Sequence, residues 1–157
     1  MTQEEYEQAK AVFDKTVDLV RLKAYAATGY EWMVVPRTGA NRTINMQHAL
    51  YIQPTDGKDN DGDGLIDEKD EFVTRADGGQ SPHNFDLARD IVPCRKSNVP
   101  WWPKGDNPLW LIMGEIAEKH GLVWGGRWTK PFDAPHIEAA NWREARTAWR
   151  AGQLNVV

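Results

Sequence analysis

Apolar residues recur at helical spacing near the start of the chain. Thr2 and Glu5 form a capping-box pattern ahead of this run, and Gly29 interrupts it. The apolar positions are Tyr6, Ala9, Val12, Phe13, Val17 and Val20. The pattern predicts a long amphipathic helix that begins near Thr2 and ends at Gly29.

Shorter apolar runs, separated by glycine and proline, predict the remaining elements. Strands are expected at 31–36, 72–74, 87–92 and 122–124. Helices are expected at 43–53, 109–120 and 139–151. The third strand should end at Pro93, which cannot donate a ladder hydrogen bond. This order predicts one small α+β domain over residues 1–157, with a mostly antiparallel sheet packed by helices.

The charge distribution excludes some classes of partner. The formal net charge is -4, and much of the acidity lies between Asp56 and Glu71. No basic patch of the kind that binds nucleic acid is visible. The first residues are acidic where a secretory signal would be basic and then apolar, and no stretch approaches the ~20 apolar residues of a membrane span. We expect a protein made in the cytoplasm without a signal peptide and without membrane insertion.

Two segments contain the side chains that are best able to bind a transition metal. These side chains are His83, Asp90, Asp133 and His136. Two imidazoles and one carboxylate are a usual ligand set for catalytic zinc, which keeps a fourth position for water. Asp133, three residues before His136, is a candidate base for that water. Spacing alone does not establish a zinc site at the sheet, because similar spacings occur by chance in many sequences.

Three sequence motifs carry a family resemblance. Residues 81–90 read SPHNFDLARD, similar to Ser-x-His-x-x-Gly-x-Ala-x-Asp. Residues 121–128 read GLVWGGRW and residues 133–138 read DAPHIE, similar to Gly-Leu-x-Trp-Gly-Gly-x-Trp and Asp-x-Pro-His-Phe-Glu. Residues 42–51 read RTINMQHALY, similar to Arg-Thr-x-x-x-Gln-x-x-Leu-Tyr. The chain therefore resembles the VanY-like family of zinc D,D-carboxypeptidases and L-alanyl-D-glutamate endopeptidases.

The resemblance implies a role for each matching residue. His83, Asp90 and His136 would bind zinc. Asp133 would take a proton from the attacking water, and Arg42 would stabilise the oxyanion formed at the scissile carbonyl.

Other residues near these motifs have more than one interpretation. Arg37 is a rival for the role of oxyanion donor. Ser81 is either a substrate contact or only the cap of a turn. Trp124 and Trp128 either line the substrate cleft or pack in the core. Glu138 is expected to support the site without binding the metal.

Three residues depart from the family pattern. Asp86 stands where the family usually has Gly, and Arg89 replaces a common apolar residue. The loop between His83 and Asp90 is therefore expected to differ in shape. Arg127 replaces a usual Asp, which bears on substrate preference more than on the metal site.

The residue at position 133 bears on the reaction. Asp there is similar to the endopeptidase branch found in many phage endolysins, whereas the carboxypeptidase branch usually has Glu. The resemblance thus implies a monomeric, zinc-dependent endolysin that hydrolyses the L-alanyl-D-glutamate bond of cell-wall stem peptides during lysis, with a holin to give it access to the wall. The alternatives are a D,D-carboxypeptidase or dipeptidase acting on D-Ala-D-Ala, and a non-catalytic, metal-stabilised binding module.

The acidic segment at about 56–71 contains the Asp-x-Asp-x-Asp-Gly core of a calcium-binding loop. The predicted ligands are Asp59, Asp61, Asp63, Leu65, Asp67 and Asp70. Asp70 stands where Glu is usual, as in the calcium loops of dockerin-type modules. Because clustered carboxylates repel one another without a cation, the segment is predicted to be a calcium-binding insertion. A solvated acidic loop is the alternative.

Overall fold

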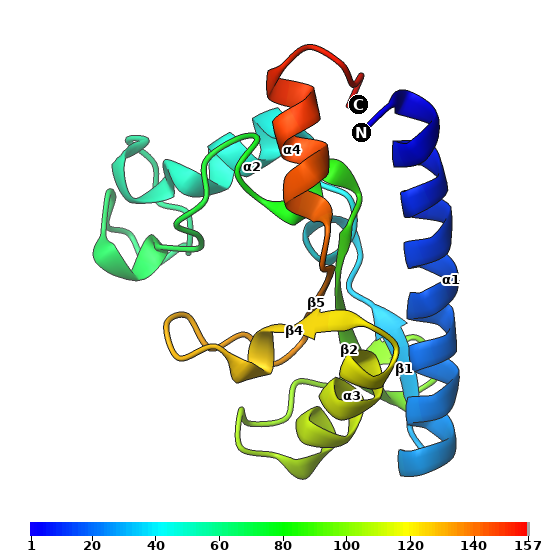
Figure 1. Ribbon diagram of the computed structural model, residues 1–157. Coiled ribbons are helices and arrows are strands. Elements are labelled where there is room, and N and C mark those ends of the chain that lie inside the picture. The colour runs from blue at the N-terminus through cyan, green and yellow to red at the C-terminus, as the bar shows by residue number, and fades with distance from the viewer. Residues whose placement is uncertain (157) are drawn as a thin grey trace.

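The computed structural model describes residues 1–156, apart from the side chain of Thr38 (Figure 1). The helices are α1 (Gln3–Thr28), α2 (Ile44–Tyr51), α3 (Pro108–Lys119) and α4 (Trp142–Arg150). The strands are β1 (Glu31–Val34), β2 (Ala88–Lys96), β3 (Val99–Pro100), β4 (Leu122–Trp124) and β5 (His136–Ala139). None of the helices in this part of the chain has the length and apolarity that a membrane crossing requires.

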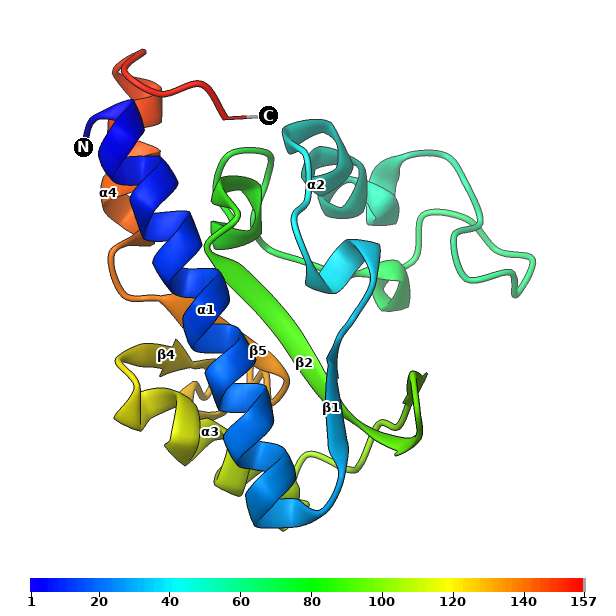
Figure 2. The ribbon, with the colours of Figure 1, turned by 90° about the vertical axis from the view of Figure 1, so that its right-hand side faces the viewer.

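The strands form one antiparallel sheet in the order β1-β2-β5-β4, with β3 paired to β2. Helix α1 runs across the sheet (Figure 2). Residues 44–80, which include α2, extend away from the sheet on the side opposite α1 (Figure 1); we call them the arm. The architecture confirms the predicted small α+β fold with an antiparallel sheet.

Helix α1 has the ends that the sequence predicts. Glu5 N donates to Thr2 Oγ1 at 3.2 Å, and Thr2 N donates to Glu5 Oε2 at 2.7 Å, which completes the capping box. Gly29 ends the helix with a φ of 74°, a conformation that glycine adopts without steric cost. The buried residues of the helix are Tyr6, Phe13, Val17, Val20 and Ala24. Val12, which the apolar pattern includes, is 63% exposed.

Strand β2 passes through Pro93, where the sequence pattern predicts its end. Ile91 N donates to Pro135 O at 2.9 Å. Alternate residues of a strand point their N–H groups to the same side, so Pro93 N faces the same edge of β2 as Ile91 N, the edge that pairs with β5. The pairing with β5 ends at Asp90, before Pro93. The proline therefore removes no ladder hydrogen bond, and β2 continues to Lys96 beside β1 and β3.

Two further sequence-based expectations are wrong. Residues 72–74 form no strand; Phe72 and Val73 are exposed, and no neighbouring strand in the described part of the chain pairs with them. Residues 136–139 form β5, so α4 begins at Trp142 and not at residue 139. Strand β5 exists because β2 and β4 pair with its two edges, and local periodicity does not reveal such distant partners.

Candidate metal centre

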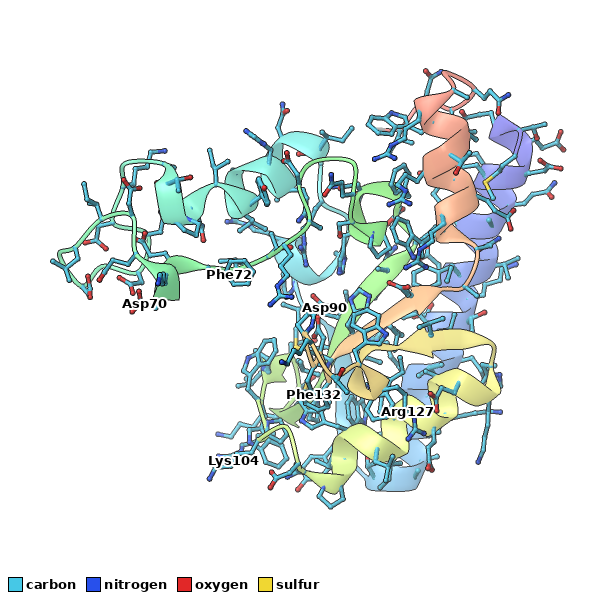
Figure 3. All side chains as sticks on the ribbon, turned by 60° about the vertical axis from the view of Figure 1, so that its left-hand side comes forward. Asp70, Phe72, Asp90, Lys104, Arg127 and Phe132 are labelled. Carbon is cyan, nitrogen blue, oxygen red and sulfur yellow. The ribbon has the colours of Figure 1, made fainter. Side chains whose placement is uncertain are left out.

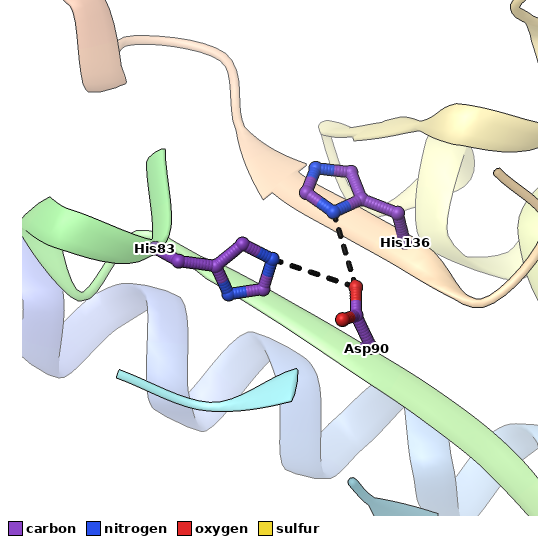
Figure 4. A group of neighbouring side chains, drawn as sticks. All are labelled: His83, Asp90 and His136. Carbon is purple, nitrogen blue, oxygen red and sulfur yellow. Dashed lines mark hydrogen bonds and ion pairs between the residues drawn. The ribbon is translucent and has the colours of Figure 1, made fainter. Parts of the chain in front are cut away.

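His83, Asp90 and His136 come together near the start of β2 and β5. The register between these strands pairs Asp90 with His136, and the 3-10 turn Pro82–Phe85 places His83 just before β2. Asp90 Oδ1 lies 3.1 Å from His136 Nδ1 and 3.5 Å from His83 Nε2 (Figure 4). One ligand atom from each residue lies within 4.8 Å of the other two, so the group has the geometry to hold a metal ion.

Each histidine has one ring nitrogen turned toward an acceptor outside this group. His83 Nδ1 lies 2.8 Å from Ala40 O, and His136 Nε2 lies 3.0 Å from Glu138 Oε2. A carbonyl or an ionised carboxylate only accepts hydrogen bonds, so each of these two nitrogens carries a proton and donates it to its acceptor. His83 Nε2 is buried and has no hydrogen-bond partner among the described residues. The nitrogens that face Asp90 are therefore the ones available to a cation.

The electrostatics favour a positive charge between the imidazoles. Burial lowers the pKa of His83. Burial also acts to lower the pKa of His136, but hydrogen bonds with Asp90 and Glu138 outweigh it and raise that pKa to about 9. Burial opposes ionisation of Asp90, yet the hydrogen bond from His136 and the adjacent ring of His83 lower its pKa. An ionised carboxylate between two imidazoles is a donor set that suits a divalent cation.

Asp133 lies on the loop that leads into β5, beside the three candidate ligands. Its backbone N donates to Gly125 O at 3.1 Å, and a Cβ atom on Gly125 would lie only 2.5 Å from Asp133 O. The glycine therefore permits a close approach that places the loop. Burial raises the pKa of the Asp133 carboxyl, against the opposing effect of His136. A partly buried carboxylate with a raised pKa is suited to accept a proton.

Arg42 contacts the carboxylate that the two histidines share. Its Nη2 atom lies 3.5 Å from Asp90 Oδ2, and its Nη1 atom donates to Gln47 Oε1 at 3.1 Å. Gln47 is fully buried and donates to Ala76 O at 2.6 Å, so its amide is fixed. Gln47 belongs to the motif at the start of α2, which is the sequence signal for this supporting role. Arg37 has an exposed side chain, and the geometry favours Arg42 as the cation of the site.

Two tryptophans predicted as substrate contacts have different environments. Trp128 is partly exposed, and its ring lies 5.1 Å from the ring of His136. Trp124 is only 4% exposed and donates its Nε1 hydrogen to Ala134 O at 2.7 Å. Of the two interpretations of Trp124, the structure supports packing in the core over substrate contact, because this residue holds the loop before β5 and presents little surface to a ligand. Arg127 lies over the Trp124 ring, 5.2 Å from its centroid.

Ser81 caps the turn that carries His83. Its Oγ atom accepts a hydrogen bond from His83 N at 3.4 Å, and its backbone N donates to Asn84 Oδ1 at 3.3 Å. With 5% of its surface exposed, Ser81 has little contact area for a substrate. Its interpretation as a turn cap is therefore the one that the structure supports.

Two departures from the family pattern are partners in the structure. Asp86 has a φ of 54°, the left-handed conformation that favours glycine. Its Oδ1 atom lies 2.7 Å from Arg89 Nη2, which also contacts Asp14 of α1 at 2.8 Å. The Arg89 guanidinium stacks over the Phe13 ring, 5.4 Å from its centroid. The loop between the first two ligands is thus tied to α1.

The acidic segment lies on the arm, and Figure 3 shows Asp70 and Phe72 there, away from Asp90. The structure groups Asp59 and Asp61 with Glu71, and one oxygen from each lies within 4.8 Å of the others. Glu71 is 3% exposed. The sequence pattern assigns this position in the ligand set to Asp70, whereas the structure brings in the next residue.

The remaining side chains of the acidic segment make local contacts. Asp63 Oδ1 accepts from Leu65 N at 2.8 Å, and Asp67 Oδ1 accepts from Gly57 N at 2.7 Å. Glu68 Oε2 is buried without a hydrogen-bond partner among the described residues. Burial and then the charges of nearby carboxylates, Asp63 first among them, raise the pKa of Glu68. The segment therefore has an excess of negative charge that its own hydrogen bonds do not neutralise.

Sequence comparisons identify related proteins. Residues 74–139 match a family model described as D-alanyl-D-alanine carboxypeptidase, and this range contains all three candidate ligands and Asp133. Over 123 residues the chain is 36% identical to the peptidoglycan L-alanyl-D-glutamate endopeptidase CwlK of Bacillus subtilis. The alignment covers 74% of this chain and 66% of that protein, so the chain spans just under two thirds of the length of this relative.

Two solved structures share the fold at low sequence identity. The LD-carboxypeptidase LdcB gives a TM-score of 0.59 at 17% identity, covering 90% of this chain and 63% of that chain. The D,D-pentapeptidase VanY of a VanB-type resistance cassette, solved as a mutant in complex with Zn(II), gives a TM-score of 0.54 at 16% identity, covering 89% of this chain and 77% of that chain. Both comparisons support the α+β architecture.

Proposed function

Because this chain belongs to the D-alanyl-D-alanine carboxypeptidase family of metallopeptidases, we propose that it is a zinc-dependent peptidase that hydrolyses the L-alanyl-D-glutamate bond of peptidoglycan stem peptides. The observation that carries the proposal is the group of His83, Asp90 and His136 with Asp133 beside it. The relative at 36% identity, itself an L-alanyl-D-glutamate endopeptidase, supports the choice of bond.

The donor atoms of the site fit zinc. They are one imidazole nitrogen from each of His83 and His136 and one carboxylate oxygen from Asp90, and all three face one another. Such a set leaves a further position open for a reactant. When bound, zinc acts as a Lewis acid on the peptide carbonyl and activates water for attack.

Two other side chains supply the proton transfer and the charge stabilisation. Asp133, whose pKa burial raises, takes a proton on its carboxylate from the attacking water and returns it to the leaving amine. Arg42, which the Gln47 amide and the Asp90 carboxylate hold, offers a fixed positive charge to the oxyanion that develops at the scissile carbonyl.

Cleavage of purified stem peptides tests the proposed reaction. Zinc-loaded protein should release fragments cut between L-alanine and D-glutamate, as identified by mass spectrometry, and removal of zinc by a chelator should abolish cleavage. Asp133→Asn should retain zinc and lose ~100-fold or more in kcat, because it cannot accept the proton.

The same assay separates the alternatives. Release of terminal D-alanine alone would indicate a D,D-carboxypeptidase or dipeptidase. Stoichiometric zinc without cleavage of any stem peptide would indicate a metal-stabilised binding module. Near-normal turnover of the Asp133→Asn variant would mean that another group is the base.

The biological role is a separate proposal that rests on the resemblance to phage endolysins. In that role the protein is made in the cytoplasm, acts as a monomer and reaches the wall through an inner membrane opened by a holin. Lysis on co-expression with a holin, and its absence without one, is the result expected.

Calcium binding by residues 59–71 is a further part of the proposal. Its support is the Asp-x-Asp-x-Asp-Gly pattern together with the grouping of Asp59, Asp61 and Glu71. The buried, unpaired Oε2 atom of Glu68 adds negative charge beside this group.

A further inference from the structure

Glu138 lies behind the candidate metal centre, on the opposite side of the His136 ring from Asp90. We propose that Glu138 and Trp142 are positioning residues that hold His136 in the tautomer and orientation in which its Nδ1 atom binds the metal. The inference rests on the proposed zinc function and adds to it residues that set the affinity for the metal.

The contact between Glu138 and His136 fixes the tautomer. These residues alternate on β5, so their side chains leave the same face of the strand. Glu138 Oε2 lies 3.0 Å from His136 Nε2, and an ionised carboxylate only accepts a hydrogen bond. Nε2 therefore keeps its proton, and Nδ1, 3.1 Å from Asp90 Oδ1, is the nitrogen that gives up its proton when a metal binds.

Trp142 fixes the carboxylate in turn. Its indole Nε1 donates to Glu138 Oε1 at 3.0 Å, so each carboxylate oxygen has its own partner. Glu138 is 3% exposed and Trp142 is 4% exposed, which leaves neither side chain room to change rotamer freely. Arg143 Nη1 lies 3.9 Å from Glu138 Oε1 and reduces the cost of burying the negative charge.

The same tryptophan connects the two histidine-bearing segments. Its ring stacks on Phe85, with centroids 6.2 Å apart and an interplanar angle of 28°. Phe85 is the last residue of the turn that carries His83. Trp142 thus contacts the His83 turn through its ring and reaches His136 through Glu138, which fixes the spacing of the two imidazoles.

The geometry also argues against two other roles for Glu138, those of metal ligand and of general base. Glu138 is not part of the group whose ligand atoms converge, because the His136 ring stands between it and Asp90. Its two oxygens accept hydrogen bonds from His136 and Trp142, which hold the carboxylate on the far side of the His136 ring from the candidate metal ligands, away from the position of a base. Its influence on the metal must pass through His136.

The test measures zinc affinity directly. Glu138→Gln keeps the size of the side chain, but its amide has one accepting atom in place of two, so one of the two hydrogen bonds is lost. We expect the zinc dissociation constant, measured by competition with a chromophoric chelator at fixed pH, to rise about 10–100-fold. Trp142→Phe keeps an aromatic ring beside Phe85 and removes the Nε1 donor, and because Glu138 remains, a smaller rise is expected.

Controls distinguish positioning from a general loss of structure. Glu144→Gln removes the same charge from an exposed position of α4 and should leave the zinc dissociation constant unchanged. The melting temperature of the zinc-free variants should stay close to wild type. In zinc-loaded wild type, ¹⁵N chemical shifts of the His136 ring should show a protonated Nε2 and a metal-bound Nδ1.

Two outcomes separate the inference from the proposed function. If wild type binds zinc and cleaves stem peptides while Glu138→Gln and Trp142→Phe bind zinc equally tightly, the positioning role is wrong and the proposed function stands. If wild type binds no zinc, the proposed function itself fails. Zinc bound through Nε2 of His136 would also overturn the inference.

Discussion

Arg42 is the cation that contacts the candidate ligands, with its Nη2 atom 3.5 Å from Asp90 Oδ2. A positive charge directed at a developing oxyanion acts mainly in the transition state. We therefore expect Arg42→Ala to lower kcat about 10²–10³-fold in zinc-loaded protein, with a much smaller change in KM. Steady-state cleavage of a stem peptide measures both constants.

A matched substitution at Arg37 controls for loss of positive charge near the site. Arg37 is exposed, so Arg37→Ala should cleave at close to the wild-type rate. Arg42→Lys keeps the charge without the planar guanidinium and should be intermediate. If Arg37→Ala proves the more damaging change, the assignment of the oxyanion donor to Arg42 is wrong.

At the scale of elements, Arg89 connects the turn before β2 to α1, because it pairs with Asp86 of the turn and with Asp14 of the helix. Arg89 is 9% exposed and contacts Asp86 at 2.7 Å and Asp14 at 2.8 Å. Arg89→Leu should lower the free energy of unfolding by about 1–3 kcal/mol, because Asp86 loses its partner. Urea denaturation of the zinc-free protein measures this difference.

Restoring the family pattern at both positions tests whether the two departures compensate for each other. Asp86→Gly removes the carboxylate and relieves the left-handed backbone at the same position. The double variant with Arg89→Leu should therefore lose less stability than the sum of the two single changes. Strictly additive losses would show that the two residues are energetically independent.

At the scale of the whole molecule, the arm joins the segment of Arg42 to the segment of His83 through its acidic loop. Arg42 N donates to His83 O at 3.1 Å, so the two segments that flank the arm also meet at the site. Calcium binding to the folded loop should raise the stability of zinc-loaded protein by about 2.7 kcal/mol at a free concentration 100 times its Kd. For a chain of this size, that predicts a rise in Tm of about 5–10 °C.

Variants of the acidic loop identify its ligands. Asp59→Asn and Glu71→Gln should abolish the calcium-dependent rise in Tm, because both side chains belong to the converging group. Asp70→Asn should retain it if Glu71 is the ligand, and should lose it if the position expected from the sequence pattern is used. Calcium loops have dissociation constants up to the millimolar range. If millimolar calcium does not change the Tm of the wild-type protein, the segment is a solvated acidic loop and not a calcium site.

Local sequence determined the features whose causes are local. The ends of α1 follow from the Thr2 and Glu5 capping box and from Gly29, and each of these acts within a few residues of its own position. The sequence also identified the candidate ligands, because imidazole and carboxylate side chains are the usual donors to zinc and the three ligand positions match the family motifs.

Tertiary structure decided the features whose partners are distant in the chain. Strand β5 forms because β2 and β4 supply its hydrogen bonds, and this pairing sets Asp90 opposite His136. The proton on Nε2 of His136 depends on the side chain of Glu138, and through it on Trp142 of α4. Residue types and spacings specify which groups are able to bind a metal, but the direction of a lone pair is set by acceptors that only folding brings into place.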